Sequence, residues 1–283
     1  SLHGCYVCLL EFVKEIIDFA GLQVKAFSDA EGLTTDEQIS IKLKKENKAF
    51  DVKKYEHSYP HCWRTDKPIL YYPLESWFIN STKLKDDFIN KNKDINWQPE
   101  STGTGRFGNW LENLVDWNLS RSRFWGTPLP IWRTKDGKDG ICIGSINELK
   151  SEIKKSVDLG FMKNNISDNI DLHRPFVDEI ILASKEGSPM YRETDIIDVW
   201  YDSGSMPFAQ YHYPFENKDI FEKMFPAKFI AEGVDQTRGW FFTLHAISIM
   251  LFGKVSYENV ISNGLVLDKD GNKMSKRLGN AVD

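Results

Sequence analysis

The chain has 283 residues, of which 41% are hydrophobic and 27% are charged. This length allows one large or two ordinary domains, each with its own core. The net charge of −5 excludes a generally basic surface for nucleic acid, so any contact with RNA must be local. No stretch reaches the roughly 18 consecutive apolar residues of a membrane span, and no signal-peptide pattern opens the sequence. We therefore expect a cytoplasmic protein without membrane contact.

The four cysteines, Cys5, Cys8, Cys62 and Cys142, are too few and too scattered for a disulfide framework. We expect reduced thiols. Cys5 and Cys8 form a C-x-x-C pair with His3 beside it, a spacing that zinc sites use. A second pair at such a spacing is missing from the sequence, so we predict no protein-bound zinc.

The first part of the chain predicts peripheral helices. Residues 12–26 have the periodicity of a short amphipathic helix, and residues 36–48 that of a polar, lysine-rich helix. From Tyr55 the composition changes to aromatic residues and proline, with candidate strands ILYY and SWFI on either side of Pro73. A new unit is expected to begin there.

The run TGTGRFG precedes a helix predicted from Asn109 to Leu119. Its glycines from Gly103 to Gly108 match G-x-G-x-x-G, but no predicted strand precedes them and no Lys-Ser or Lys-Thr pair follows. We interpret the run as a turn before the helix. A strand should follow, with its end fixed by Pro128 and Pro130.

Residues 145–172 predict a charged, helical insertion. Beyond it, a buried strand is expected from Ile196 to Tyr201, running into a turn at Ser203 and Gly204. Near the end of the sequence, two short strands are expected around the Asp270-Gly271 turn.

The run AKFIAEGVDQTRGWFFTLHAISIMLFG predicts a strand from Lys228 to Ala231 with Glu232 and Gly233 at its tip. A buried helix should follow from near Asp235 to Phe252, because its apolar residues lie on every side. This order is the repeating unit of an open α/β sheet, in which ligands bind beyond the carboxyl ends of the strands.

Five separated motifs then point to one family. They are HSYPHCWRTDKP (57–68), WNLSRSRFWGTPLPIW (117–132), DVWYDSG (198–204), AEGVDQTRGWFFT (231–243) and KMSKR (273–277). In these motifs the chain resembles the class I aminoacyl-tRNA synthetases, specifically the isoleucyl-tRNA synthetases. The resemblance implies an α/β fold in which residues 56–283 are the distal half of a Rossmann-type catalytic domain. It identifies residues 1–55 with the tail of the inserted editing domain.

The implied reaction is the ATP-dependent ligation of isoleucine to its tRNA through isoleucyl-adenylate. The amino-acid carboxylate attacks the α-phosphorus of ATP, and ammonium groups and Mg²⁺ can stabilise the charge that develops on the phosphate oxygens. By resemblance, Lys273 and Lys276 of KMSKR are the catalytic and ATP-binding residues. Arg277 stands where the family has serine, and we expect little effect because both lysines are present.

On the amino-acid side, the resemblance implies that Glu232, Asp235 and Gln236 bind the α-ammonium and the ribose hydroxyls of the adenylate. It places Trp200 and Trp240 on either side of the isoleucine side chain. From the residue pattern alone, Asp235 is equally a helix N-cap, and a single tryptophan is more often core than ligand.

The implied partners are isoleucine, ATP with Mg²⁺, and isoleucine tRNA, bound by a monomer. The family's H-x-G-H signature and its anticodon-binding helices do not occur in this sequence, so we expect an internal part of a longer enzyme that is inactive alone. Valyl- and leucyl-tRNA synthetases share the fold and remain alternatives, although DVWYDSG and EGVDQTRGW favour isoleucine. A catalytically silent RNA-binding or structural module is the alternative from another class.

Overall fold

Contacts between residues divide the chain into two compact units, Ser1–Glu75 and Ser76–Asp283. In the first unit, helix α2 (Thr35–Lys45) confirms the lysine-rich helix predicted over residues 36–48. The helix predicted over residues 12–26 and the Cys5–Cys8 pair lie outside the described residues. The computed structural model describes residues 35–52, 60–62, 65, 67, 69, 74–163, 170–272, 274, 279 and 280.

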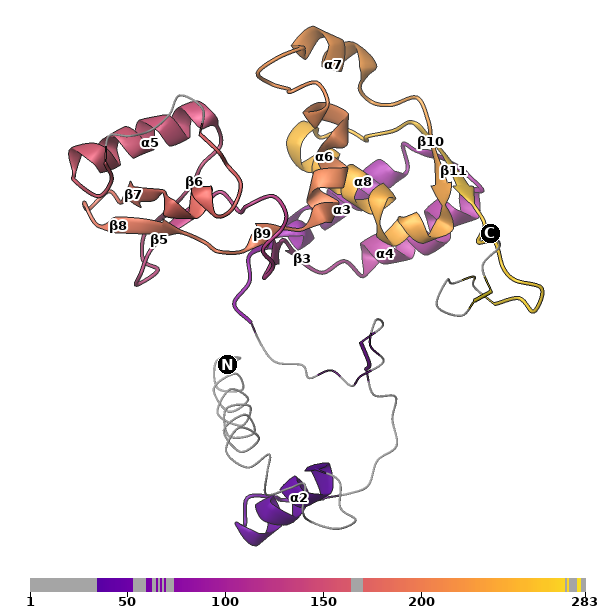
Figure 1. Cartoon of the computed structure of the whole chain (residues 1–283). Helices are drawn as coiled ribbons and strands as arrows, with labels where there is room; N and C mark the ends of the chain where they lie inside the picture. Colours follow the sequence, from indigo (N-terminus) through magenta and orange to yellow (C-terminus); the bar gives the residue numbers. More distant parts are fainter. Residues whose placement is uncertain are drawn as a thin grey trace. The chain divides into compact units, whose positions relative to one another are not determined.

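The second unit combines helices with short strands (Figure 1). Its helical segments are η1 (Ser81–Leu84), α3 (Lys85–Asn92), η2 (Thr102–Phe107), α4 (Gly108–Glu112), α5 (Ile146–Asp158), η3 (Phe176–Glu179), α6 (Val199–Ala209), α7 (Lys218–Met224), η4 (Val234–Arg238) and α8 (Trp240–Phe252). Its strands are β1 (Phe78–Ile79), β2 (Asn96–Gln98), β3 (Trp117–Asn118), β4 (Ser120–Arg121), β5 (Ile131–Thr134), β6 (Gly140–Cys142), β7 (Ile181–Ala183), β8 (Pro189–Arg192), β9 (Ile196–Ile197), β10 (Ile230–Gly233) and β11 (Asn259–Asn263).

A parallel sheet of β10, β11 and β2, with β11 in the centre, carries the predicted site. Helix α8 connects β10 to β11, as parallel strands require a crossover (Figure 1). The strand, Glu-Gly and helix order predicted from the sequence is confirmed, but the strand lies two residues later than expected. The continuous helix expected from Asp235 is wrong, because the chain forms a 3₁₀ helix over η4 and leaves the helical conformation at Gly239 before α8 begins.

The core of this part surrounds α8. The helix is apolar on every side, and its residues from Phe241 to Ile249 are buried. They pack against Trp97 of β2, Phe107 of η2 and Val260 of β11, which have at most 4% of their surface exposed. Packing on several sides of one helix explains why its sequence has no polar face.

An antiparallel sheet in the order β6-β5-β8-β7 forms a second layer with α5 (Figure 1). Helix α5 confirms the helical insertion predicted within residues 145–172. Ser145 caps it by accepting a hydrogen bond from the Glu148 N–H at 3.1 Å, and the Glu148 carboxylate accepts one from the Gly144 N–H at 2.7 Å. Its apolar residues Leu149 and Ile153 are buried against this sheet.

Two local predictions are wrong around TGTGRFG. The run forms a π-helix, η2, continuous with α4, instead of a turn, and the helix ends at Glu112 instead of Leu119. A Cβ atom on Gly103 would lie 2.2 Å from the Trp97 ring, so glycine allows this helix to approach β2.

The strand expected to end at Pro128 and Pro130 is also wrong, because β4 is short and β5 begins only after Pro130.

The strand expected from Ile196 to Tyr201 is wrong as well. Only β9 is extended, and the Asp198 side chain caps α6 by accepting a hydrogen bond from the Trp200 N–H at 3.3 Å. The strand expected just before the Asp270-Gly271 turn ends earlier, at Asn263, and pairs in parallel with two neighbours. Among the described residues, none of the helices has the length and apolar character needed to cross a membrane.

Candidate functional site

The carboxyl end of β10 presents two acidic side chains. Glu232 is exposed near the tip of the strand, and Asp235 is exposed in η4 just beyond it. A Cβ atom on Gly233 would lie 2.5 Å from the Asp235 Oδ1 atom, so the absent side chain leaves room for this carboxylate. The structure therefore places both residues at the end of a parallel strand, where ligands of open α/β sheets bind.

Gln236 connects this strand end to α8. Its Oε1 atom accepts a hydrogen bond from the backbone N–H of Trp240 at 3.0 Å, and its Nε2 atom donates to Asp235 Oδ2 at 3.3 Å. The first four N–H groups of a helix have no partner within the helix. The N-cap residue of α8 is Gly239, which has no side chain to accept a hydrogen bond. Gln236, in the preceding turn, therefore provides the acceptor for the first of these N–H groups.

The π-helix η2 supports the turn that carries Asp235 and Gln236. Arg106 of η2 donates a 2.9 Å hydrogen bond from Nε to the hydroxyl of Thr237, which is fully buried. The same hydroxyl donates to the Val234 carbonyl at 2.8 Å. The glycine-rich run thus stabilises the backbone of η4, which carries Asp235 and Gln236. π-Helices are frequent at functional sites.

The two predicted tryptophans lie at the starts of two helices that pack together, α6 and α8. The Trp240 Nε1–H donates a 3.0 Å hydrogen bond to the Ser203 carbonyl of α6. In an uninterrupted helix this carbonyl would accept from the N–H of residue 207, but Pro207 has no N–H. The proline therefore leaves the Ser203 carbonyl available for the indole of Trp240.

Trp200 is 40% exposed and meets the same region through Gly239. A Cβ atom on Gly239 would lie 3.1 Å from the Trp200 ring and 2.8 Å from Gln236 Oε1. Glycine at this position thus brings Trp200, Gln236 and the start of α8 together. Asp235 connects to this group through the hydrogen bond from Gln236, and Glu232 connects to it through the chain.

The start of α6 is held by Asp198, whose side chain is 6% exposed. Its Oδ2 atom accepts hydrogen bonds from Trp117 Nε1 at 3.0 Å and from Arg121 Nη2 at 2.9 Å. A buried carboxylate with an arginine partner and a helix N-terminus is well compensated. Asp198 thereby fixes the backbone from which Trp200 projects.

Asp202, one turn further along α6, accepts a 3.2 Å hydrogen bond from the Thr127 hydroxyl. Burial raises the pKa of this carboxyl group above its usual value, and this hydrogen bond opposes the shift. Asp202 therefore connects α6 to the segment that leads into β5.

The predicted catalytic lysines, Lys273 and Lys276, lie outside the described residues. The residues that flank these lysines are hydrogen-bonded to Asp268. The Asp268 carboxylate accepts hydrogen bonds from the Asn280 side chain at 2.7 Å and from the Asn272 N–H at 2.8 Å. These bonds hold the pKa of Asp268 below its usual value.

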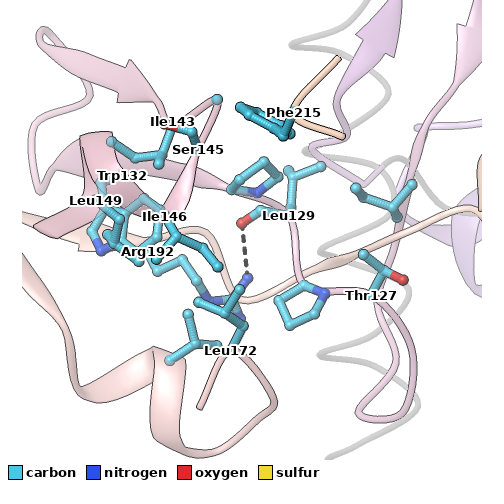
Figure 2. Close-up of a pocket in the computed structure, with 15 residues that line it drawn as sticks. Thr127, Leu129, Trp132, Ile143, Ser145, Ile146, Leu149, Leu172, Arg192 and Phe215 are labelled. Carbon is cyan, nitrogen blue, oxygen red and sulfur yellow. Dashed lines mark hydrogen bonds between the residues drawn. The ribbon is translucent and has the colours of Figure 1, made fainter. Parts of the chain in front are cut away.

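The most apolar cavity described lies elsewhere, between the antiparallel sheet and the chain around Leu129 (Figure 2). Its volume is about 320 Å³, and Trp132, Leu149 and Phe215 contribute to its walls. Arg192 reaches this cavity, but its Nη1 donates to the Leu129 and Asp195 carbonyls, both at 3.1 Å, and its guanidinium pairs with Asp178. Because these partners occupy the arginine and none of the predicted site residues lines the cavity, it is not the candidate site.

Among the described residues, no cluster of three or more His, Cys, Asp or Glu side chains could hold a metal ion. Mg²⁺ is commonly bound through substrate phosphates with only one or two protein carboxylates.

A family model for class I tRNA synthetases of the I, L, M and V group matches residues 13–283. The chain belongs to the class I tRNA synthetases. The match covers most of the chain, including β10, α6, α8 and the segment with both predicted lysines.

This synthetase chain is similar to an isoleucine--tRNA ligase of Cytophaga hutchinsonii, with 64% identity over 96% of the chain and 26% of the relative. An isoleucine--tRNA ligase of Bacteroides thetaiotaomicron is also 64% identical, over 92% of the chain and 24% of the relative. The chain thus spans about a quarter of the length of these curated relatives. A methionyl-tRNA synthetase structure from Mycobacterium tuberculosis, bound by methionyl-adenylate, aligns at 17% identity over 80% of the chain and 32% of its own, with a TM-score of 0.44.

Sequence reasoning missed three residues that shape this part of the synthetase: Asp198, Pro207 and Gly239. The signal for Pro207 was present, because a proline inside a helix leaves a carbonyl unpaired. The other two depend on contacts with Trp117 and Trp200, which local patterns do not reveal.

Proposed function

We propose that the complete protein containing this chain ligates isoleucine to its tRNA through an isoleucyl-adenylate, in a reaction driven by ATP. The observation that carries the proposal is the 64% identity to isoleucine--tRNA ligases along nearly the whole chain. The arrangement of Glu232, Gln236, Trp200 and Trp240 around the end of β10 is compatible with this activity.

In the proposed site, the carboxylates of Glu232 and Asp235 accept hydrogen bonds from the α-ammonium group and the ribose hydroxyls. Both are exposed beyond a parallel strand, which supports contact with a ligand. The Gln236 oxygen accepts one hydrogen bond from Trp240, and its amide group donates one to Asp235. One lone pair of the oxygen and one amide N–H therefore remain for the ligand.

Trp200 and Trp240 form the sides of an apolar slot for the isoleucine side chain. Their indole rings lose little conformational entropy on binding, and both are fixed by neighbours: Trp240 by the Ser203 carbonyl and Trp200 by packing on Gly239. An apolar slot separates isoleucine from valine by one methylene, which limits discrimination to roughly 1–3 kcal/mol.

On the phosphate side, Lys273 and Lys276 stabilise the charge that develops on the α-phosphate and the leaving pyrophosphate. Mg²⁺ enters with ATP and supplies further positive charge to the phosphates. The chain contributes no nucleophile, because the amino-acid carboxylate is the attacking group. Its task is to position the reactants and to stabilise charge.

We assign residues 56–283 to the distal half of a Rossmann-type catalytic domain, and residues 1–55 to the tail of the editing domain. The parallel β10 and β11 strands joined by α8 support the first assignment. The second rests on the sequence resemblance. The monomeric state, the cytoplasmic location and the tRNA partner are part of the same proposal.

The test is amino-acid-dependent exchange of labelled pyrophosphate into ATP, measured on the complete protein with isoleucine, valine and leucine in turn. Isoleucine should support the largest kcat/KM, about a hundredfold above valine. A reaction without amino acid gives the background. If valine or leucine supports faster exchange than isoleucine, the assigned substrate is wrong.

A further inference from the structure

Arg192, the last residue of β8, is buried and uses every donor of its guanidinium group. Its Nε donates to Asp178 Oδ1 at 2.6 Å. Its Nη1 donates to the carbonyls of Leu129 and Asp195, both at 3.1 Å, and Figure 2 shows the bond to Leu129. Its Nη2 pairs with Asp178 and donates to the Thr194 carbonyl at 3.3 Å. All five N–H groups therefore have acceptors within the chain, and none remains for a ligand.

Asp178, in η3, balances the buried positive charge of Arg192. Its carboxylate also accepts a hydrogen bond from Arg174 Nε at 2.7 Å. Burial alone would raise the pKa of Asp178, but the hydrogen bonds from both arginines hold it below its usual value, so the group is charged at neutral pH. Arg174 also donates to the Arg123 carbonyl at 3.1 Å. Arg174 thus shares the acidic partner of Arg192 without sharing its bonds to Leu129 and Asp195.

The bonds from Arg192 fix the chain just before α6. The Asp195 carbonyl accepts from Arg192 and from the Leu129 N–H at 3.2 Å, so both of its lone pairs are used. The extended strand β9 follows directly and leads to Asp198, whose carboxylate caps α6. Three extended residues span about 10 Å and leave the chain little slack. A displacement of Asp195 should therefore reach the start of α6.

Trp200 projects from the start of α6, and its position depends on this backbone. Its N–H donates to Asp198 Oδ1 at 3.3 Å, and its ring lies next to Gly239. The residue is 40% exposed, so packing restrains the ring less than it restrains a buried side chain. The placement of the indole therefore follows the placement of the helix N-terminus.

We propose that Arg192 is a positioning residue for the amino-acid slot, because it fixes the path from Asp195 to α6 and thereby the placement of Trp200. This inference rests on the proposed function, in which Trp200 forms one side of the slot. Since Arg192 has no donor for a reactant, its effect belongs to amino-acid binding and not to the chemical step. A lysine cannot replace it, because a single ammonium group lacks the planar fork that reaches all of these acceptors.

The test is Arg192→Lys in the complete protein, assayed by pyrophosphate exchange. The KM for isoleucine should rise about three- to tenfold, while kcat and the KM for ATP change less than about twofold. Arg174→Lys is the matched control, because it also replaces a partner of Asp178 and should also lower the thermal midpoint. It should leave the KM for isoleucine unchanged. Equal KM values in the two variants would overturn the proposal, since lost stability would then explain both.

A second measurement asks whether Arg192 acts through Trp200. In a Trp200→Ala background, Arg192→Lys should change the KM for isoleucine less than about twofold, because the ring that it positions is absent. If the two effects multiply in the double variant, Arg192 acts elsewhere and the inference is wrong. If exchange selects another amino acid, the proposed substrate fails, and the same comparison made with that amino acid still tests Arg192.

Discussion

The indole N–H of Trp240 donates its hydrogen bond to the Ser203 carbonyl, which has no helical partner because residue 207 is proline. One helix therefore gives up a backbone hydrogen bond, and a side chain of another helix takes its place. The orientation of Trp240 thus depends on a residue, Pro207, whose backbone carries no donor at all.

We predict that Pro207→Ala separates stability from substrate use. The new N–H can bond to the Ser203 carbonyl and should stabilise α6 by about 1 kcal/mol or more. Competition for this carbonyl should loosen Trp240 and raise the KM for isoleucine about threefold. Chemical denaturation and pyrophosphate exchange on the complete protein check both effects. A stabilised variant with an unchanged KM would show that the carbonyl accepts both bonds.

Gly239→Ala should impair the amino-acid side of the site. The added methyl group would lie within 3.1 Å of both Gln236 Oε1 and the Trp200 ring, so both must move. We expect the KM for isoleucine to rise about tenfold or more, with the KM for ATP changed less than about twofold. Gly264→Ala is the control, because nothing lies within 4 Å of its Cβ position. Similar kinetics for the two variants would remove Gly239 from the site.

Lys276→Ala should slow adenylate formation about a hundredfold or more, because its contact is proposed to form with the transition-state phosphate. The affinity for isoleucine should stay nearly unchanged, and Lys273→Ala should behave similarly. Single-turnover measurement of adenylate formation separates the two quantities. Lys269→Ala, an exposed lysine in the preceding turn, should retain the parent rate. A normal rate with a raised isoleucine KM would contradict the role given to both lysines.

His245 should make the stability of the α8 region depend on pH. Its Nε2 lies 2.9 Å from the Phe88 carbonyl, which can only accept, so Nε2 carries the proton in the neutral ring. Among the described residues, Nδ1 has no partner. Burial lowers the pKa of His245 from 6.5 to about 4.

The unfolded chain therefore binds a proton between pH 6.5 and 4 that the folded chain excludes. This contribution to stability is complete above about pH 6.5 and falls toward pH 4, by on the order of 3 kcal/mol in all. Urea denaturation at several pH values measures the slope. His245→Gln should flatten it, whereas His173→Gln, at a side chain 84% exposed, should leave it unchanged. The same slope in the parent and His245→Gln proteins would contradict this assignment.

The sequence predicted the elements whose signals are local. The charged helical pattern within residues 145–172 and the apolar run of α8 each specify a helix without help from distant residues. The tip of β10 was predicted for the same reason, since Glu232 and Gly233 separate a strand pattern from a helix pattern. The acidic part of the candidate site follows from that order of elements.

The rest depends on contacts between residues far apart in the chain. Residues 196–201, IIDVWY, are mostly apolar and predict a strand, yet Asp198 begins a helix there because Trp117 and Arg121 hold its carboxylate. TGTGRFG contains residues typical of turns, yet it packs as a π-helix because Gly103 fits against Trp97. Such tertiary packing overrides the local preference and cannot be deduced from a short window.

Asp268 has a consequence for how the lysine-bearing segment can change in evolution. One carboxylate accepts bonds from Asn272 before the segment and from Asn280 after it, so these two positions must stay a fixed distance apart. An inserted or deleted residue would break one bond or force the remainder to bulge. Related chains should therefore differ here by substitution and seldom by a change in length.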